Sequence, residues 1–129
     1  MKEEINAYNN ILELIGNTPL IKLNKVTEQL EGNFYAKVEA FNPGHSTKDR
    51  IALFIIEEAE KRGILTPGDT IIETTSGNTG FSLAMVSIIK GYNCISAVTS
   101  KSSKDKIDML LALGSKVYVC PAHVSADDE

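Results

Sequence analysis

The strongest candidate for a catalytic residue in the sequence is a lysine at the predicted start of a helix. Lys48 follows the turn-forming residues Asn42-Pro43-Gly44 and precedes an apolar stripe with helical spacing. A cation is disfavoured at a helix N-terminus, because the helix dipole is positive there. That position, together with partial burial, would favour the neutral amine that a Schiff base with a carbonyl compound requires. A solvated lysine offset by Asp49 is the alternative interpretation.

A second segment offers groups that could bind an anion. It reads Thr75-Ser76-Gly77-Asn78-Thr79-Gly80 and runs from a predicted strand into a predicted helix. Its hydroxyl groups, one amide side chain and several backbone N–H groups could converge on a carboxylate or phosphate at the helix N-terminus. An ordinary capped turn between a strand and a helix would explain the same residues.

Together, the lysine loop (residues 42–50) and the anion loop (residues 75–80) suggest one site. Each follows a predicted strand, and we expect these two strands to be near neighbours. In α/β sheets, ligands bind at the loops that leave the carboxyl ends of the strands. Linking an amine covalently to a carbonyl group beside a bound amino-acid carboxylate would require this pair of loops.

Hydrophobic periodicity places both loops in an alternation of strands and helices. Strands are expected at residues 20–23, 34–39, 70–73, 93–98 and 116–120. Helices are expected to end at Gly63, Gly91 and Gly114. Ser46 and Asp49 have the spacing of a capping-box variant at the start of the first helix. From residue 34 onward, the order β-α-β-α-β-α-β predicts an α/β fold, a three-layer sandwich with a mostly parallel sheet and right-handed crossovers.

Composition excludes several classes of protein. A chain of 129 residues with 43% hydrophobic residues is the size of one domain and can form a core. The formal net charge of −4 gives no basic surface for nucleic acid or an anionic membrane. The longest apolar stretch, Phe81 to Ile89, is too short to span a bilayer, and residues 1–10 have no apolar signal-peptide region. We expect a cytoplasmic protein without nucleic-acid or membrane partners.

The cysteines and histidines are not expected to take part in catalysis or metal binding. Cys94 and Cys120 lie in predicted strands, without a CxxC partner or a histidine at ligand spacing. We therefore expect free thiols and no metal site. His123 is expected in a surface loop, and His45 is expected to be steric or solvent-facing although it lies beside Lys48.

Three motifs occur in order along the chain: Ile15-Gly16-Asn17-Thr18-Pro19-Leu20, Asn42-Pro43-Gly44 with Ser46-Thr47-Lys48-Asp49-Arg50, and the anion loop. This order resembles the cysteine synthase and cystathionine β-synthase family, which are pyridoxal-phosphate enzymes of fold type II. The resemblance extends from about Ile11 to Cys120 and covers less than half of a typical member. The chain departs from the family at His45, Thr47 and Thr74, none of which removes a catalytic group.

The resemblance implies part of a tryptophan synthase β-like fold that uses pyridoxal 5′-phosphate. It implies that Lys48 bonds covalently to the cofactor and later moves the α-proton of the substrate. Asn78 would hydrogen-bond the ring hydroxyl group of the cofactor. The residues that would hold the substrate carboxylate are Thr75, Ser76, Gly77, Asn78 and Thr79. The reaction would be β-replacement on serine or O-acetylserine by a thiol or sulfide, giving cysteine or cystathionine, in a homodimeric full-length enzyme.

The resemblance also implies a domain division. Residues 1–33 would belong with the larger domain of the full enzyme, and residues 34–129 would form the smaller α/β domain. The family's glycine-rich loop for the cofactor phosphate comes later in the chain, and no such loop follows Gly80. We therefore expect an incomplete enzyme that binds the cofactor poorly alone. The alternatives are another fold type II enzyme, such as a serine or threonine dehydratase, and a non-catalytic fragment that acts only in association.

Overall fold

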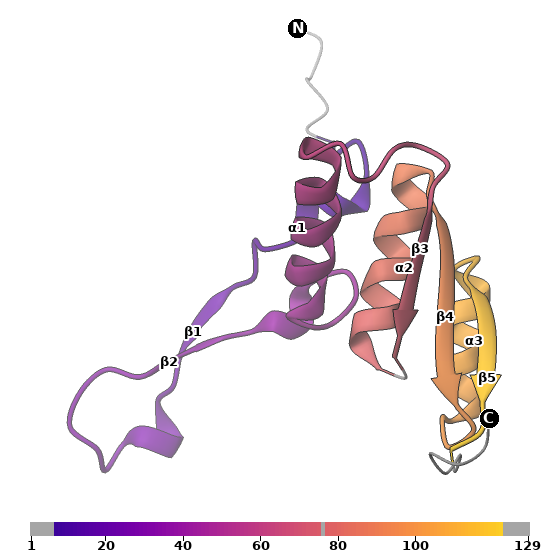
Figure 1. The fold of residues 1–129 in the computed structure, drawn as a ribbon. Coiled ribbons are helices and arrows are strands. Elements are labelled where there is room, and N and C mark those ends of the chain that lie inside the picture. Colours follow the sequence, from indigo (N-terminus) through magenta and orange to yellow (C-terminus); the bar gives the residue numbers. More distant parts are fainter. Residues whose placement is uncertain (1–6, 76, 123–129) are drawn as a thin grey trace, which may run out of the picture.

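Helices and strands alternate along the computed structural model, which describes residues 7–75 and 77–122 (Figure 1). Its α-helices are α1 (Lys48–Lys61), α2 (Asn78–Lys90) and α3 (Lys104–Ala112). Its strands are β1 (Leu20–Lys22), β2 (Tyr35–Lys37), β3 (Thr70–Thr74), β4 (Asn93–Thr99) and β5 (Lys116–Cys120). Short 3₁₀ helices cover Ile11–Leu14, Lys25–Thr27 and Glu39–Phe41.

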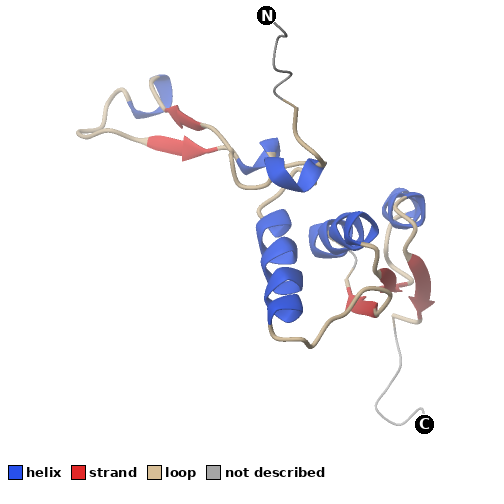
Figure 2. Ribbon diagram, turned by 90° about the horizontal axis from the view of Figure 1, so that it is seen from above, coloured by secondary structure: helices blue, strands red, loops and turns tan. Residues whose placement is uncertain are grey.

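The strands β3, β4 and β5 form a parallel sheet in sequence order. The crossover helices α2 and α3 lie on the same face of this sheet, and α1 lies beside α2, away from the strands (Figure 2). Two right-handed crossovers that move across a sheet in one direction place their helices on one face. These observations confirm the predicted α/β class and parallel sheet. On the other face, Ile72 and Tyr118 are exposed, and no described helix forms a third layer there.

The prediction that residues 34–39 join the parallel sheet is wrong. The strand β2 pairs antiparallel with β1, with Leu20 opposite Lys37, in a separate two-stranded ribbon. Figure 1 shows this ribbon projecting away from the helices and the sheet. Alternating apolar residues predict a strand but do not identify its partner strand. The proposed domain boundary at residue 33 falls between these two paired strands and stays a prediction.

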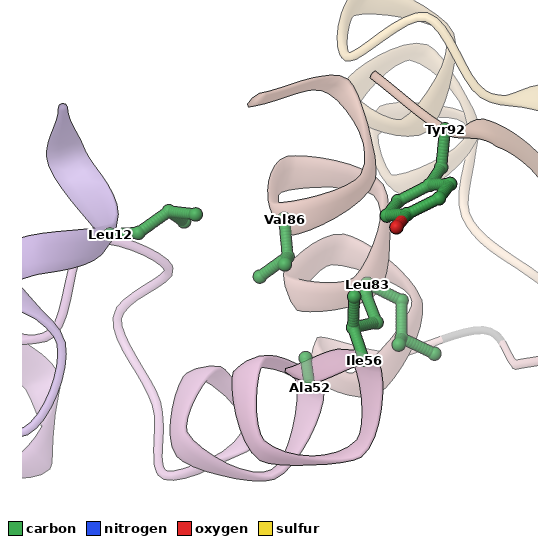
Figure 3. Packing of buried hydrophobic residues seen from close by; sticks show 6 residues of the cluster. All are labelled: Leu12, Ala52, Ile56, Leu83, Val86 and Tyr92. Atoms are coloured by element: carbon green, nitrogen blue, oxygen red, sulfur yellow. The ribbon is translucent and has the colours of Figure 1, made fainter. Parts of the chain in front are cut away.

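A hydrophobic cluster joins α1 to α2. Figure 3 shows its buried residues: Leu12, Ala52, Ile56, Leu83, Val86 and Tyr92. A second cluster of Ala84, Cys94, Val98 and Leu110 joins α2 to the sheet and to α3. Because α2 packs on both sides, it is buried along most of its length, as expected for a helix that is apolar all round. It ends at Gly91, whose φ of 80° is left-handed, and Gly63 and Gly114 follow α1 and α3 as predicted.

The described residues contain no helix long and apolar enough to cross a membrane. Both cysteines are free thiols, with Cys94 buried and Cys120 exposed. No three acidic, cysteine or histidine side chains gather to hold a metal ion in the part of the chain described. His123 lies outside the described residues.

Candidate active site

Lys48 is the first residue of α1 and is half-buried, so the predicted helix start is confirmed. Its backbone N–H donates to Ser46 Oγ at 3.2 Å. The capping-box prediction is wrong, because Asp49 does not reach back to Ser46. Instead, Asp49 Oδ2 accepts a hydrogen bond from the Gly44 N–H at 2.5 Å. The carboxylate thus closes the turn before the helix, where the buried Gly44 N–H requires an acceptor.

A polar network around Asn42 holds the outer side of the lysine loop. Asn42 is 1% exposed, and its Oδ1 accepts from the Gly16 N–H at 2.9 Å while its Nδ2 donates to the Ser46 carbonyl at 2.9 Å. Arg50 donates to Glu39 Oε2 at 2.8 Å and to the Gly16 carbonyl at 2.9 Å. The Asn42 network (Gly16, Thr18, Glu39, Asn42 and Arg50) therefore ties the first sequence motif to the lysine loop.

The Asn42 network remains charged over a wide pH range. Hydrogen bonding from Arg50 lowers the pKa of Glu39 to about 2, and hydrogen bonds from Thr18 and Asn42 act in the same direction. In turn, the hydrogen bond to Glu39 raises the pKa of Arg50 above its ordinary value. Both partners of the ion pair that anchors the lysine loop, Glu39 and Arg50, thus stay ionised near neutral pH.

The anion loop extends the sheet and then starts α2. The Thr75 N–H donates to the Ala97 carbonyl at 3.0 Å, and Thr75 Oγ1 accepts from the Gly77 N–H at 3.2 Å. Gly77 is the N-cap residue of α2, and no side-chain cap bond forms there among the described residues. N–H groups at such an end are available to an anion. Ser76 lies outside the described residues.

Gly80 lets α2 begin close to the end of β3. It is buried, and a methyl group on it would overlap the Cγ2 atom of Thr75. Gly77 is different, because the position of an added Cβ has no neighbour within 4 Å among the described atoms. The backbone at Gly77 is therefore open to the approach of another molecule.

A cavity of about 210 Å³ lies between the two loops. The lysine loop contributes Gly44 and His45, and the anion loop contributes Gly77 and Asn78. The remaining lining residues are Phe81, Lys106, Met109 and Leu110. The structure thus brings the two loops together, although Lys48, Thr75 and Thr79 are not among the described residues that line this cavity. Its volume is below the roughly 300 Å³ at which ligand pockets usually begin.

The two loops meet through their helices and not through adjacent strands, so the predicted reason for their proximity is wrong. The N-terminal ends of α1 and α2 are bridged by Ser82 Oγ, which donates to Asp49 Oδ1 at 2.5 Å. Both side chains are 0% exposed. A signal for this bridge exists in the sequence, because Ser82 interrupts the apolar stretch Phe81 to Ile89, and a buried hydroxyl group requires a hydrogen-bond partner.

Sequence reasoning missed the contribution of α3 to the cavity. From the sequence, this helix is predicted only as the element that ends at Gly114. Leu110 is buried in the second hydrophobic cluster and also lines the cavity, where Lys106 and Met109 join it. Periodicity alone identifies an apolar face but not which part of that face borders a site.

Comparisons with known proteins define the class to which this fold and site belong. A family model described as "Pyridoxal-phosphate dependent enzyme" matches residues 11–129. The chain therefore belongs to the family of pyridoxal-phosphate-dependent enzymes, and the resemblance seen in its motifs is confirmed.

Curated relatives include the cystathionine beta-synthase of Mus musculus, 48% identical over 120 residues that cover 92% of this chain and 21% of the relative. Cysteine synthase 1 of Emericella nidulans is 48% identical over 114 residues, covering 88% of this chain and 31% of the relative. The chain thus spans less than a third of the length of these two relatives.

Solved structures of similar proteins support the same family assignment. A hydrogen sulfide-producing enzyme from Fusobacterium nucleatum superposes with a TM-score of 0.84 at 43% identity, covering 90% of this chain and 38% of that one. An O-ureido-L-serine synthase superposes with a TM-score of 0.82 at 40% identity, covering 94% of this chain and 38% of that one. The predicted fold is therefore confirmed over most of the chain.

The described residues fit one part of pyridoxal phosphate. The half-buried Lys48 supplies an amine beside the shared cavity without lining it, and Gly77, with its open backbone, and Asn78 border that cavity. The phosphate group of the cofactor requires its own set of N–H donors. Beyond Gly80, the described part of the sequence has no second glycine-rich loop to provide them.

Proposed function

We propose that this chain is the part of a pyridoxal-phosphate-dependent β-replacement enzyme that carries the cofactor-binding lysine and the substrate-carboxylate loop. The observation that supports this most directly is the cavity that the lysine loop and the anion loop share. The relatives named cystathionine beta-synthase, cysteine synthase and O-ureido-L-serine synthase support an amino-acid substrate.

Lys48 has two roles in this proposal. Its Nζ atom would hold the cofactor covalently, and as a free amine it would accept the proton from the substrate α-carbon. When bound, pyridoxal phosphate supplies an electron sink for the electron pair left on that carbon. Asn78 would hold the cofactor through a hydrogen bond from its side-chain amide to the ring hydroxyl group.

The anion loop binds the carboxylate of the substrate. The hydroxyl groups of Thr75, Ser76 and Thr79 donate to it, together with backbone N–H groups of the same loop. Support comes from the exposed start of α2, where the positive end of the helix dipole favours an anion. The first substrate is serine or O-acetylserine, and a thiol or sulfide replaces the group on its β-carbon.

The wall that α3 and α2 contribute suits this chemistry. Phe81, Met109 and Leu110 contribute apolar side chains to the lining of the cavity. Electrostatic interactions are stronger where water is excluded, so a carboxylate held beside this wall is positioned more firmly than in water.

The test uses the protein encoded by the complete reading frame that contains this chain. The purified protein is supplied with pyridoxal phosphate, serine or O-acetylserine, and sulfide or homocysteine, and the products are identified by mass spectrometry. Formation of cysteine or cystathionine that Lys48→Ala abolishes would support the proposal. Lys61→Ala, at the other end of α1, is the matched control and should leave the rate unchanged. Equal product formation by Lys48→Ala and the wild type would contradict it.

A further inference from the structure

Asp49 is the one carboxylate among residues 7–75 and 77–122 that is fully buried. Its two oxygen atoms accept hydrogen bonds from the Gly44 N–H and from Ser82 Oγ, both at 2.5 Å. No described ion pair includes it. A buried charge is costly unless it is paired or hydrogen-bonded, so these two hydrogen bonds hold the carboxylate in place.

The two donors belong to opposite sides of the shared cavity. Gly44 lies in the lysine loop, four residues before Lys48, and lines the cavity directly. Ser82 lies one helical turn after Asn78, and Asn78 lines the cavity from the start of α2. Residues four apart on a helix share a face. Asp49 therefore connects the wall formed by the lysine loop to the helix that carries the wall formed by the anion loop.

The packing around Asp49 leaves little freedom for either side. A Cβ atom on Gly44 would overlap the Asp49 carboxylate, so the loop backbone lies in direct contact with it. Ser82 is 0% exposed and lies between α1 and α2. A change in the length or hydrogen-bonding pattern of this bridge would shift one wall of the cavity relative to the other.

We propose that Asp49 is a positioning residue that sets the separation between the lysine loop and the anion loop. This inference rests on the proposed function, because it assigns to Asp49 the alignment of Lys48 with the bound substrate carboxylate. Asp49 acts through Gly44 and Ser82 and does not itself touch the substrate.

The same pair of helices offers a matched control. At the far end of α1, Glu60 accepts hydrogen bonds from Lys90 Nζ at 2.9 Å and from Tyr92 Oη at 2.8 Å. This connection also joins α1 to α2 and the residues after it, but none of its members lines the cavity. Glu60→Gln therefore weakens the helix pair without affecting the alignment of the two loops.

The kinetic experiment compares Asp49→Asn, Ser82→Ala and Glu60→Gln in the protein from the complete reading frame, loaded with pyridoxal phosphate. Asp49→Asn should lower kcat on the order of 100-fold, because misplacement of reacting groups by about 1 Å has that effect. The absorbance of the lysine-bound cofactor should persist, since the Lys48 amine is intact. Glu60→Gln should retain the wild-type kcat even where its thermal stability falls as far as that of Asp49→Asn.

Ser82→Ala keeps the carboxylate and removes one of its two partners, so it provides a milder variant if Asp49→Asn does not fold. It should lower kcat by less than Asp49→Asn. The double variant should be no slower than Asp49→Asn alone, because residues that act through one bridge are not additive. Equal kcat values in Ser82→Ala and Glu60→Gln, at equal stability, would overturn the proposal.

A second measurement is independent of catalysis. In the cofactor-free protein, the Gly44 amide proton should resonate downfield, as expected for a charge-assisted hydrogen bond to a buried carboxylate. Ser82→Ala and Asp49→Asn should move both the Gly44 and the Asn78 amide resonances, whereas Glu60→Gln should move neither. If the wild type catalyses no β-replacement, the proposed function fails, and these resonances still decide whether Asp49 couples the two walls. Resonances that do not move in Asp49→Asn would overturn the coupling.

Discussion

Replacing Gly44 by alanine tests how tightly the lysine loop packs on the buried carboxylate. The φ of Gly44 is not left-handed, so alanine introduces no backbone strain there. The added methyl group would overlap the Asp49 carboxylate, which is hydrogen-bonded to Gly44 and to Ser82 and cannot move away freely. Either the loop or the carboxylate must shift.

The magnitude follows from two effects. Overpacking a close-packed interior typically costs about 1–3 kcal/mol. A shift also weakens the Gly44–Asp49 hydrogen bond, and a hydrogen bond to a charged group contributes about 1.5–3 kcal/mol. The free energy of unfolding should therefore fall by about 3 kcal/mol or more in Gly44→Ala. With a urea dependence of about 2 kcal/mol per molar, the urea midpoint should fall by about 1.5 M.

The assay is urea unfolding of the chain, followed by circular dichroism, with Gly77→Ala as the control. Gly77 also borders the cavity and also lacks a left-handed φ, but an added methyl group meets no described atom within 4 Å. The free energy of unfolding of Gly77→Ala should fall only because alanine is a less favourable N-cap residue, by about 1 kcal/mol or less. Equal midpoints for the two variants would refute the close packing of Gly44 on Asp49.

Three further outcomes are expected. Thr79→Ala should weaken serine or O-acetylserine binding by about ten- to a hundred-fold, measured by spectroscopic titration, because it removes one hydrogen bond to a charged carboxylate; unchanged affinity would exclude Thr79 from the anion loop's function. The pKa of Glu39 is about 2 in the folded chain against an ordinary value of 4.5, so its stabilising effect is fully present above pH 4.5 and is lost as the pH falls toward 2. Thermal unfolding of Glu39→Gln should consequently vary less with pH across that window than unfolding of the wild type, and identical slopes would contradict this. The 129-residue chain alone should bind pyridoxal phosphate weakly, and tight titration that Lys48→Ala abolishes would show that its site is complete.

The elements of the α/β part could be predicted from the sequence because each has a local signal. The predicted strands 70–73, 93–98 and 116–120 match β3, β4 and β5 to within one residue. The helices end at the predicted glycines because the residue that follows a helix often adopts a left-handed φ. Glycine adopts this conformation without strain, so the signal is local in the sequence. The pairing of β2 with the preceding strand β1 was missed, because its alternation fits a two-stranded ribbon as well as a larger sheet.

In the candidate site as well, features with a local sequence motif could be predicted, whereas contacts between residues far apart in the sequence could not. The motifs identified the two loops, and the shared cavity places residues from both of them together. They did not identify the bridge from Asp49 to Ser82, which joins residues 33 positions apart. Nor did they show what the first motif does. Neither Gly16 nor Thr18 lines the cavity within the described part of the chain, and both bind Arg50 in the Asn42 network.

The lysine loop is therefore held on two sides by networks of different physical character. On the outer side, the Asn42 network depends on an ion pair whose side chains are 39% exposed at Arg50 and 19% exposed at Glu39. Salt screens exposed charges over about 8 Å at physiological ionic strength, whereas buried groups are screened much less. On the inner side, Asp49 and Ser82 are 0% exposed. High salt should consequently weaken the attachment of residues 15–20 to the loop before it changes the separation of the two loops. The geometry that the proposed chemistry requires thus depends on the buried side, and the exposed side determines how firmly the N-terminal segment is attached to it.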